Sequence, residues 1–190
     1  MLEGALDRAR HLNDLLEDLL TYSNAVSARL VIELARENIA ELVRDYCDQR
    51  RAGVSASLRE ITFSCDSELP PARCDRQRLV QILDQLLDNA LKFTPSGSHL
   101  QLSAETLETA GRYWVCVHFA DDGPGIPIER IHSIFNSFEQ VDGSQTRVVG
   151  GMGMGLALAR ELADRMECRL DVRSAPDQGT TFTLMIPAGS

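Results

Sequence analysis

The chain has 190 residues, of which 44% are hydrophobic and 25% are charged, and its net charge at pH 7 is -9. This length accommodates one well-buried domain with a short appendage, but not two full domains. The acidic charge argues against nucleic-acid binding, which needs a basic surface. The sequence shows neither an apolar run of the roughly 18 residues that cross a bilayer nor a secretory signal at its start. We therefore expect a soluble domain that makes no direct membrane contact.

The cysteines and the single lysine of the sequence are informative. The five cysteines are scattered and form no C-x-x-C pair, which argues against a zinc site or a disulfide framework and predicts reduced thiols. Of the 19 basic residues, only Lys92 is a lysine. Either the genome favours arginine and this lysine survives by chance, or position 92 requires a compact ammonium group rather than a planar guanidinium group.

Residues 1–22 have the pattern of a helix with a heptad seam. Apolar residues recur at alternating spacings of three and four, and further leucines widen the stripe: Leu2, Ala5, Leu6, Ala9, Leu12, Leu15, Leu16, Leu19 and Leu20. A stripe of this width suits a helix bundle, and a single helix has nothing to bury it against. The pattern predicts self-association or a partner helix, with a connector at 23–30.

Residues 31–187 alternate between strand and helix patterns. Alternating hydrophobicity and turn signals predict strands at 31–34, 61–65, 100–107, 112–120, 169–173 and 181–186. Apolar residues at helical spacing predict helices at 38–51, 75–93 and 154–166. Residues 121–155 hold seven glycines and little periodicity, which predicts a long loop, and such loops are usually functional or disordered.

The helix predicted at 75–93 is the most informative element. Its apolar face is formed by Leu79, Leu83, Leu86 and Ala90. A polar stripe runs along its other side and consists of Arg78, Gln81, Gln85, Asn89 and Lys92. Such a stripe is often merely solvated, so it gains meaning only from the motifs around it.

Three short motifs follow one another: N-A-L-K-F-T at 89–94, D-D-G-P-G-I at 121–126 and G-G-M-G-M-G-L at 150–156. Each is weak alone, because glycine-rich segments often mark only a turn. Together they supply what a nucleotide needs. Asp121 ends a predicted strand, where its carboxylate can accept a hydrogen bond from the adenine amino group. Gly123 and Gly125 let the backbone pass the base without a Cβ clash.

The phosphate end of a nucleotide also finds matching groups. Asn89 offers an amide oxygen to Mg²⁺, which prefers oxygen ligands, and Lys92 lies one turn further along to meet the phosphates. Gly151, Gly153 and Gly155 open a helix whose amino-terminal N–H groups suit an anion. Neither a Walker motif nor a Rossmann fingerprint is present. The motifs predict an adenine nucleotide with Mg²⁺ held through Asn89.

In this order the motifs resemble those of sensor histidine kinases, which belong to the GHKL superfamily. The matching segments are the asparagine-box helix at 75–95, the first glycine box at 121–127, a hybrid-kinase type of lid segment at 134–147, the second glycine box at 150–158 and the closing Gly-Thr motif at 179–182. The resemblance implies an α/β (α+β) two-layer sandwich of the Bergerat type, in which a mixed sheet backs three helices. It also implies that 1–22 is the second helix of the dimerisation and phosphotransfer stalk, and that 31–187 is the ATP-binding domain.

The resemblance implies a role for each motif residue. Outside the glycine boxes these are Asn89 as Mg²⁺ ligand, Lys92 as phosphate contact, Phe93 as neighbour of the nucleotide, Asp121 as selector of adenine, Arg147 as partner of the γ-phosphate and Thr180 as support for Asp121. The binding positions within the boxes are Gly123, Gly125, Ile126, Gly151, Gly153, Gly155 and Leu156. The glycines at 151, 153 and 155 would also serve as hinges of the lid.

The sequence departs from the family at points that bear on catalysis. It has no H-E-L-R-T-P-like segment with a phosphoacceptor, and His11 lies on the predicted second stalk helix, so we do not expect this chain to phosphorylate itself. The implied catalytic set is Gln85, Lys92 and Arg147. Gln85 stands where the family usually has asparagine or an acidic residue, and glutamine cannot act as a general base. Met152 replaces a small polar residue between the glycines.

These observations lead to one hypothesis and one alternative. The hypothesis is a protein-histidine kinase domain that transfers the γ-phosphoryl group of Mg-ATP to a stalk histidine outside this chain. The alternative is a degenerate regulatory module that pairs with another kinase through the stalk helix. Expected partners are ATP or ADP, a second copy or another kinase, and a response regulator or receiver domain. The expected location is the cytoplasm, with a parent protein that could be anchored in the inner membrane.

Overall fold

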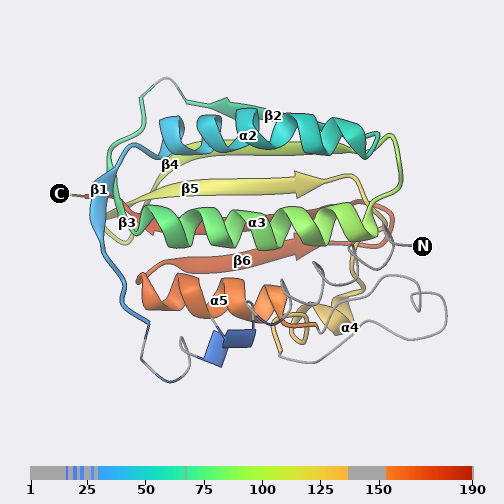
Figure 1. The fold of residues 1–190 in the computed structure, drawn as a ribbon. Helices are drawn as coiled ribbons and strands as arrows, with labels where there is room; N and C mark the ends of the chain where they lie inside the picture. Colours follow the sequence, from blue (N-terminus) through green and yellow to red (C-terminus); the bar gives the residue numbers. More distant parts are fainter. Residues whose placement is uncertain are drawn as a thin grey trace.

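The structure is a computed structural model that describes residues 30–66, 68–136 and 153–189, together with a few positions between 16 and 27. In this part of the chain a layer of helices lies against one face of a β-sheet (Figure 1). No helix among the described residues is both long and apolar enough to cross a membrane.

The main sheet has five strands in the order β2-β4-β5-β7-β6. The strands are β2 (Glu60–Cys65), β4 (His99–Thr109), β5 (Arg112–Asp121), β6 (Arg169–Ser174) and β7 (Thr180–Pro187). β2 and β4 are parallel and the other neighbours are antiparallel, so the sheet is mixed. Two short strands, β1 (Ala35–Glu37) and β3 (Ala72–Cys74), form a separate antiparallel pair.

Three longer helices cover the sheet: α2 (Ile39–Ala56), α3 (Arg76–Phe93) and α5 (Gly155–Arg165). A carboxylate or amide side chain starts each of the first two, since Asn38 accepts a hydrogen bond from the Glu41 N–H and Asp75 accepts one from the Arg78 N–H. The core lies between the layers and is formed by fully buried side chains that alternate along the strands or recur at helical spacing: Leu79, Leu83, Leu100, Leu102, Phe119, Leu158, Leu162 and Phe182. The predicted fold class therefore describes the observed architecture.

Two predictions about elements were wrong. Residues 31–34 form no strand, because the Glu33 N–H donates to the Asp75 carboxylate at 2.9 Å and strand pairing begins only at Ala35, opposite Cys74. The segment 121–155, predicted as one long loop, contains a short helix, α4 (Ile128–Ile131). The strand β3 was not predicted at all, because three residues are too few to show a period.

The other predicted elements are observed with shifted ends. The largest shift is in α2, which was expected to end at 51 and continues to Ala56. Most of the predicted stalk helix at 1–22, most of the lid segment and the residues Arg147, Gly151 and Met152 lie outside the described residues.

Candidate functional site

Three elements bring the predicted site residues to one end of the sheet. Asp121 ends β5 and lies opposite Thr180, the first residue of β7. The last turns of α3 carry Asn89, Lys92 and Phe93, and Gly155 begins α5, which packs beside α3. The described part of the site is therefore assembled from a strand end, a helix carboxyl end and a helix amino end.

The Asp121 carboxyl group is held in place by its own turn. Its Oδ1 accepts a hydrogen bond from the Gly123 N–H at 2.9 Å. Burial raises the pKa of this carboxyl group, and the backbone N–H groups of Gly123 and Thr180 oppose that rise by stabilising the ionised form. The result is a half-buried hydrogen-bond acceptor that is anchored by backbone donors at the end of a strand.

Two glycines allow the turn after Asp121 to pack closely against the turn before Thr180. Gly125 has φ +70°, and a Cβ atom there would lie 1.9 Å from the Ala175 carbonyl oxygen. Gly179 has φ +73°, and its Cβ atom would lie 2.0 Å from the Asp121 carbonyl oxygen. Both positions thus require glycine for conformation and for space.

Ser174 ties these two turns together. Its hydroxyl group accepts from the Ile126 N–H at 2.8 Å, donates to the Gly179 carbonyl oxygen at 2.7 Å and lies 3.0 Å from the Thr180 hydroxyl group. Ser174 was not singled out from the sequence, because a serine at the end of a strand has no distinctive signal. It accounts for the fixed position of the predicted residues Ile126 and Thr180.

The carboxyl end of α3 presents an amide, a cation and an aromatic ring in succession. The Asn89 side chain is half-buried and Lys92 is exposed. Phe93 is 46% exposed. An amide oxygen that is partly shielded from water fits the chemistry of Mg²⁺, which is usually held by one or two protein oxygens and by phosphate oxygens. The residues present are therefore compatible with a magnesium ion, with Asn89 as its ligand.

Gln85 lies against the start of α5. A Cβ atom on Gly155 would lie 2.4 Å from the Gln85 Oε1 atom. The N-cap residue Met154 supplies no side-chain hydrogen bond to this helix, and Gly153 before it has φ +69°. Leu156, the other predicted residue of this box, is half-buried in the first turn.

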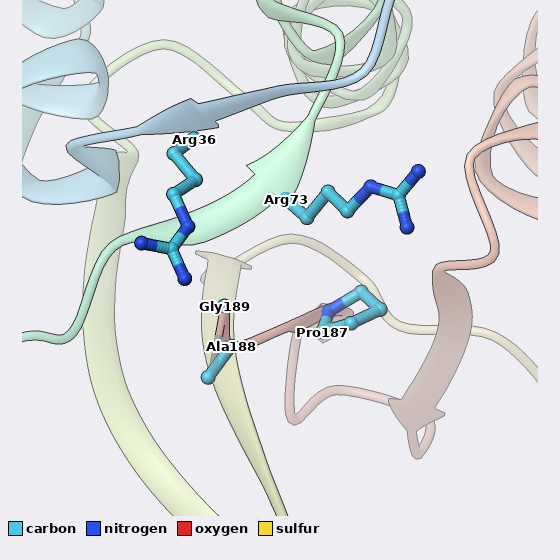
Figure 2. Close-up of a pocket in the computed structure, with 5 residues that line it drawn as sticks. All are labelled: Arg36, Arg73, Pro187, Ala188 and Gly189. Carbon is cyan, nitrogen blue, oxygen red and sulfur yellow. The ribbon is translucent and has the colours of Figure 1, made fainter.

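The pocket shown in Figure 2 lies at the other end of the sheet. It is lined by Arg36, Arg73, Pro187, Ala188 and Gly189. Pro187 lies opposite Trp114 near the start of β5, whereas Asp121 is at the end of that strand. Figure 2 also shows the two guanidinium groups pointing in different directions rather than toward one another. This pocket is therefore separate from the candidate site.

The chain matches a known ATPase family and resembles several sensor kinases. A family model described as histidine kinase-, DNA gyrase B-, and HSP90-like ATPase matches residues 74–190. The sensor histidine kinase YkoH of Bacillus subtilis is 32% identical over 183 residues, which cover 96% of this chain and 38% of YkoH. The adaptive-response sensory kinase SasA of Thermosynechococcus vestitus is 31% identical over 190 residues, which cover 100% of this chain and 49% of SasA.

Solved structures agree with these relatives. Full-length ShkA in complex with AMPPNP has a TM-score of 0.82 at 28% identity, covering 97% of this chain and 38% of that chain. The histidine kinase ThkA in complex with the response regulator protein TrrA has a TM-score of 0.75 at 23% identity, which shows the likeness of fold.

The chain belongs to the family of histidine kinase-, DNA gyrase B- and HSP90-like ATPases and is a sensor histidine kinase ATP-binding catalytic domain. This confirms the resemblance drawn from the motifs and the predicted fold class. The chain spans less than half the length of the two relatives, 38% of YkoH and 49% of SasA.

Proposed function

We propose that this domain binds Mg-ATP and transfers its γ-phosphoryl group to a histidine that the rest of a longer protein, or a partner, supplies. The observation that carries the proposal is the convergence of Asp121, the Asn89–Lys92 stripe of α3 and the amino end of α5 at one end of the sheet. Phosphoryl transfer relies mainly on positioning and on charge stabilisation, and these residues can supply both.

Each group has a part in holding the nucleotide. The Asp121 carboxylate accepts from the adenine amino group, and the Gly123 N–H anchors that carboxylate. The sequence prediction that Gly125 makes room for the base is corrected, because its missing Cβ atom makes room for the Ala175 carbonyl oxygen instead. Phe93 offers its exposed ring to the nucleotide. Asn89 would hold Mg²⁺, which would neutralise negative charge on the phosphates. Lys92 meets the phosphates as a point charge, and the N–H groups at the start of α5 face the same anion.

In the transfer step a histidine ring nitrogen attacks the γ-phosphorus atom as the bond to the ADP oxygen breaks. The attacking nitrogen is the unprotonated one, and the proton on the other ring nitrogen passes to solvent or to a base other than Gln85, since Gln85 cannot accept it. Arg147 is proposed to neutralise the γ-phosphate, and Gly151, Gly153 and Gly155 to act as lid hinges. The role of Gln85 in this scheme is therefore to contact or position groups, and not to act as a general base.

The stalk and its partners form the second part of the proposal. We assign 1–22 to the second stalk helix, 23–30 to a connector and 31–187 to the ATP-binding domain. Leu16, Leu19 and Leu20 are helical, and they are 50%, 36% and 62% exposed. Such side chains favour burial against a second copy or another kinase.

A response regulator or receiver domain would accept the phosphoryl group next, and the cytoplasm is the proposed location.

Calorimetric titration with ATP and ADP, with and without Mg²⁺, tests the binding step. We expect Mg²⁺-dependent ATP binding that Asn89→Ala weakens about tenfold, equal to about 1.4 kcal/mol.

The transfer step is then tested by adding a separately purified stalk that carries the phosphoacceptor histidine. ATP binding without any phosphorylation of such a stalk would contradict the transferase role. It would favour the regulatory module, which is suggested by the glutamine at position 85, where the family usually has asparagine or an acidic residue.

A further inference from the structure

Arg59 lies outside every motif and yet contacts the helix end that carries the nucleotide-binding residues. It precedes β2 directly and its side chain is half-buried. The guanidinium group donates to the Thr94 hydroxyl group at 2.9 Å, to the Leu91 carbonyl oxygen at 3.1 Å and to the Thr94 carbonyl oxygen. It also donates to the Ser57 carbonyl oxygen at 2.9 Å, within its own turn.

These contacts cap the carboxyl end of α3. The last carbonyl groups of a helix have no partner within the helix and carry a partial negative charge, which a cation stabilises. Arginine serves this purpose better than lysine because its planar fork donates in several fixed directions at once. Asn89, Lys92 and Phe93 lie in the last two turns of the same helix. Arg59 therefore holds the part of α3 from which these side chains project.

Thr94 extends the connection to the adenine side of the site. It is only 4% exposed, and its hydroxyl group donates to the Ala90 carbonyl oxygen at 2.8 Å while it accepts from Arg59. Its methyl carbon lies 3.0 Å from where a Cβ atom on Gly123 would be. Gly123 in turn donates to the Asp121 carboxylate. Arg59, Thr94 and the turn after Asp121 are thus neighbours in this order.

We propose that Arg59 is a positioning residue that sets the spacing between the phosphate-binding end of α3 and the adenine-binding turn at Asp121. This inference rests on the proposed nucleotide binding, which Arg59 would affect through Thr94 without touching the nucleotide. ATP touches both sides of the site, so its affinity depends on their spacing. A ligand that touches one side only does not depend on it.

The test compares ATP with two shorter ligands, AMP for the adenine side and tripolyphosphate for the phosphate side, by titration of Arg59→Gln. Arg51→Gln is the matched control, because Arg51 is an exposed arginine that forms a surface ion pair with Asp48 at 3.1 Å. We expect Arg59→Gln to weaken ATP about tenfold and each shorter ligand less than about threefold. Arg51→Gln should bind all three like the original chain.

Two substitutions at Thr94 test whether the effect passes through this residue. Thr94→Val keeps a methyl group beside Gly123 but removes the hydroxyl group that accepts from Arg59, leaving its carbonyl acceptors in place. Thr94→Ser keeps the hydroxyl group and removes the methyl group. We expect Thr94→Val to weaken ATP as Arg59→Gln does, and the double substitution to be no weaker than either single one. In a Thr94→Ser background, which lacks the methyl group beside Gly123, Arg59→Gln should weaken ATP less than it does in the original chain.

The outcomes separate this inference from the proposed function. Failure of the original chain to bind ATP would overturn both. If a folded Arg59→Gln protein bound ATP as tightly as Arg51→Gln does, this inference alone would be overturned. An equal loss of affinity for ATP, AMP and tripolyphosphate would also overturn it. Should Arg59→Gln fail to fold, Arg59→Lys keeps the charge without the fork, and the same comparison of ligands applies to it.

Discussion

The Gln85 amide oxygen occupies the space in which a side chain at Gly155 would begin, 2.4 Å from the position of the missing Cβ atom. Gln85 projects from the polar stripe of α3 and Gly155 is the first residue of α5, so this contact joins the two helices at the proposed phosphate-binding end. Gly155 does not have a positive φ angle, so its lack of a side chain is explained by Gln85 rather than by backbone conformation.

The contact between Gln85 and Gly155 predicts an energetic coupling. Alanine is favoured over glycine within a helix by up to about 1 kcal/mol, but Gly155→Ala must also displace the Gln85 amide. In a Gln85→Ala background the displacement disappears, so Gly155→Ala should be more favourable there by about 0.5–1 kcal/mol. Urea unfolding of the four proteins measures the difference. Equal effects of Gly155→Ala in both backgrounds would show that the contact contributes nothing.

Glycine is required more strictly at 125 than at 111, although both residues have a φ angle near +70°. A left-handed conformation costs alanine roughly 1–2 kcal/mol at either position. At Gly111 a Cβ atom meets nothing within 4 Å, whereas at Gly125 it would lie 1.9 Å from the Ala175 carbonyl oxygen. Gly111→Ala should therefore lower the free energy of unfolding by roughly 1–2 kcal/mol and Gly125→Ala by clearly more. Comparable denaturation midpoints for the two variants would be inconsistent with this packing.

Lys92 offers a direct chemical test, because it is the only lysine in the chain. Its exposed ammonium group should react with an amine acylating reagent, and bound ATP should slow that reaction by covering it. Peptide mass spectrometry separates the Lys92 adduct from that of the terminal amine, which serves as the internal control. Labelling of Lys92 that saturating Mg-ATP leaves unchanged would argue against a phosphate contact.

Substitution at Lys92 separates the need for charge from the need for a compact ammonium group. We expect Lys92→Gln to weaken ATP about tenfold while affecting AMP little, because the lost charge faces the distal phosphates. Lys92→Arg keeps the charge in a planar form. If Lys92→Arg binds ATP as well as the original chain, position 92 needs only a positive charge and the lysine is there by chance. If its affinity for ATP stays low, the position requires a compact ammonium group.

The raised pKa of Asp121 predicts how ATP affinity depends on pH. The adenine amino group donates to the ionised carboxylate, so ATP binds preferentially to the domain in which Asp121 is ionised. When ATP binds to the domain in which Asp121 is protonated, that proton is released. Affinity should therefore increase as the pH rises through the raised pKa, above the range of an ordinary aspartate. Calorimetry in buffers of different ionisation enthalpy detects the released proton. Asp121→Asn, which does not titrate, should lose this part of the dependence.

The same pKa shift acts on stability with the opposite trend. Without nucleotide, the folded domain holds the Asp121 proton more tightly than the unfolded chain does. The contribution of Asp121 to the free energy of unfolding therefore decreases as the pH rises from the ordinary aspartate range through the raised pKa. Thermal unfolding of the nucleotide-free protein and of Asp121→Asn across this range isolates the contribution. A contribution that increases with pH would contradict burial as the dominant cause of the shift.

Sequence patterns determined the parts of this protein that depend on neighbours along the chain. The helix α3, observed at Arg76–Phe93, was predicted at 75–93 because its apolar and polar residues recur at helical spacing. The same spacing placed Gln85, Asn89 and Lys92 on one stripe, and the ordered motifs indicated ATP. Strands with clear alternation, such as β5 and β7, were predicted for the same reason.

Tertiary structure alone decided which distant residues meet. No local period indicates that Glu33 bonds to the Asp75 side chain, which displaced the first strand from 31–34 to Ala35–Glu37. Nor does any motif indicate that Gln85 fills the space beside Gly155, or that Arg59 caps the helix ending at Thr94. Such contacts depend on the order of strands in the sheet and on the packing of helices over it. The sequence thus determined the chemical groups of the site, and the fold determined their partners.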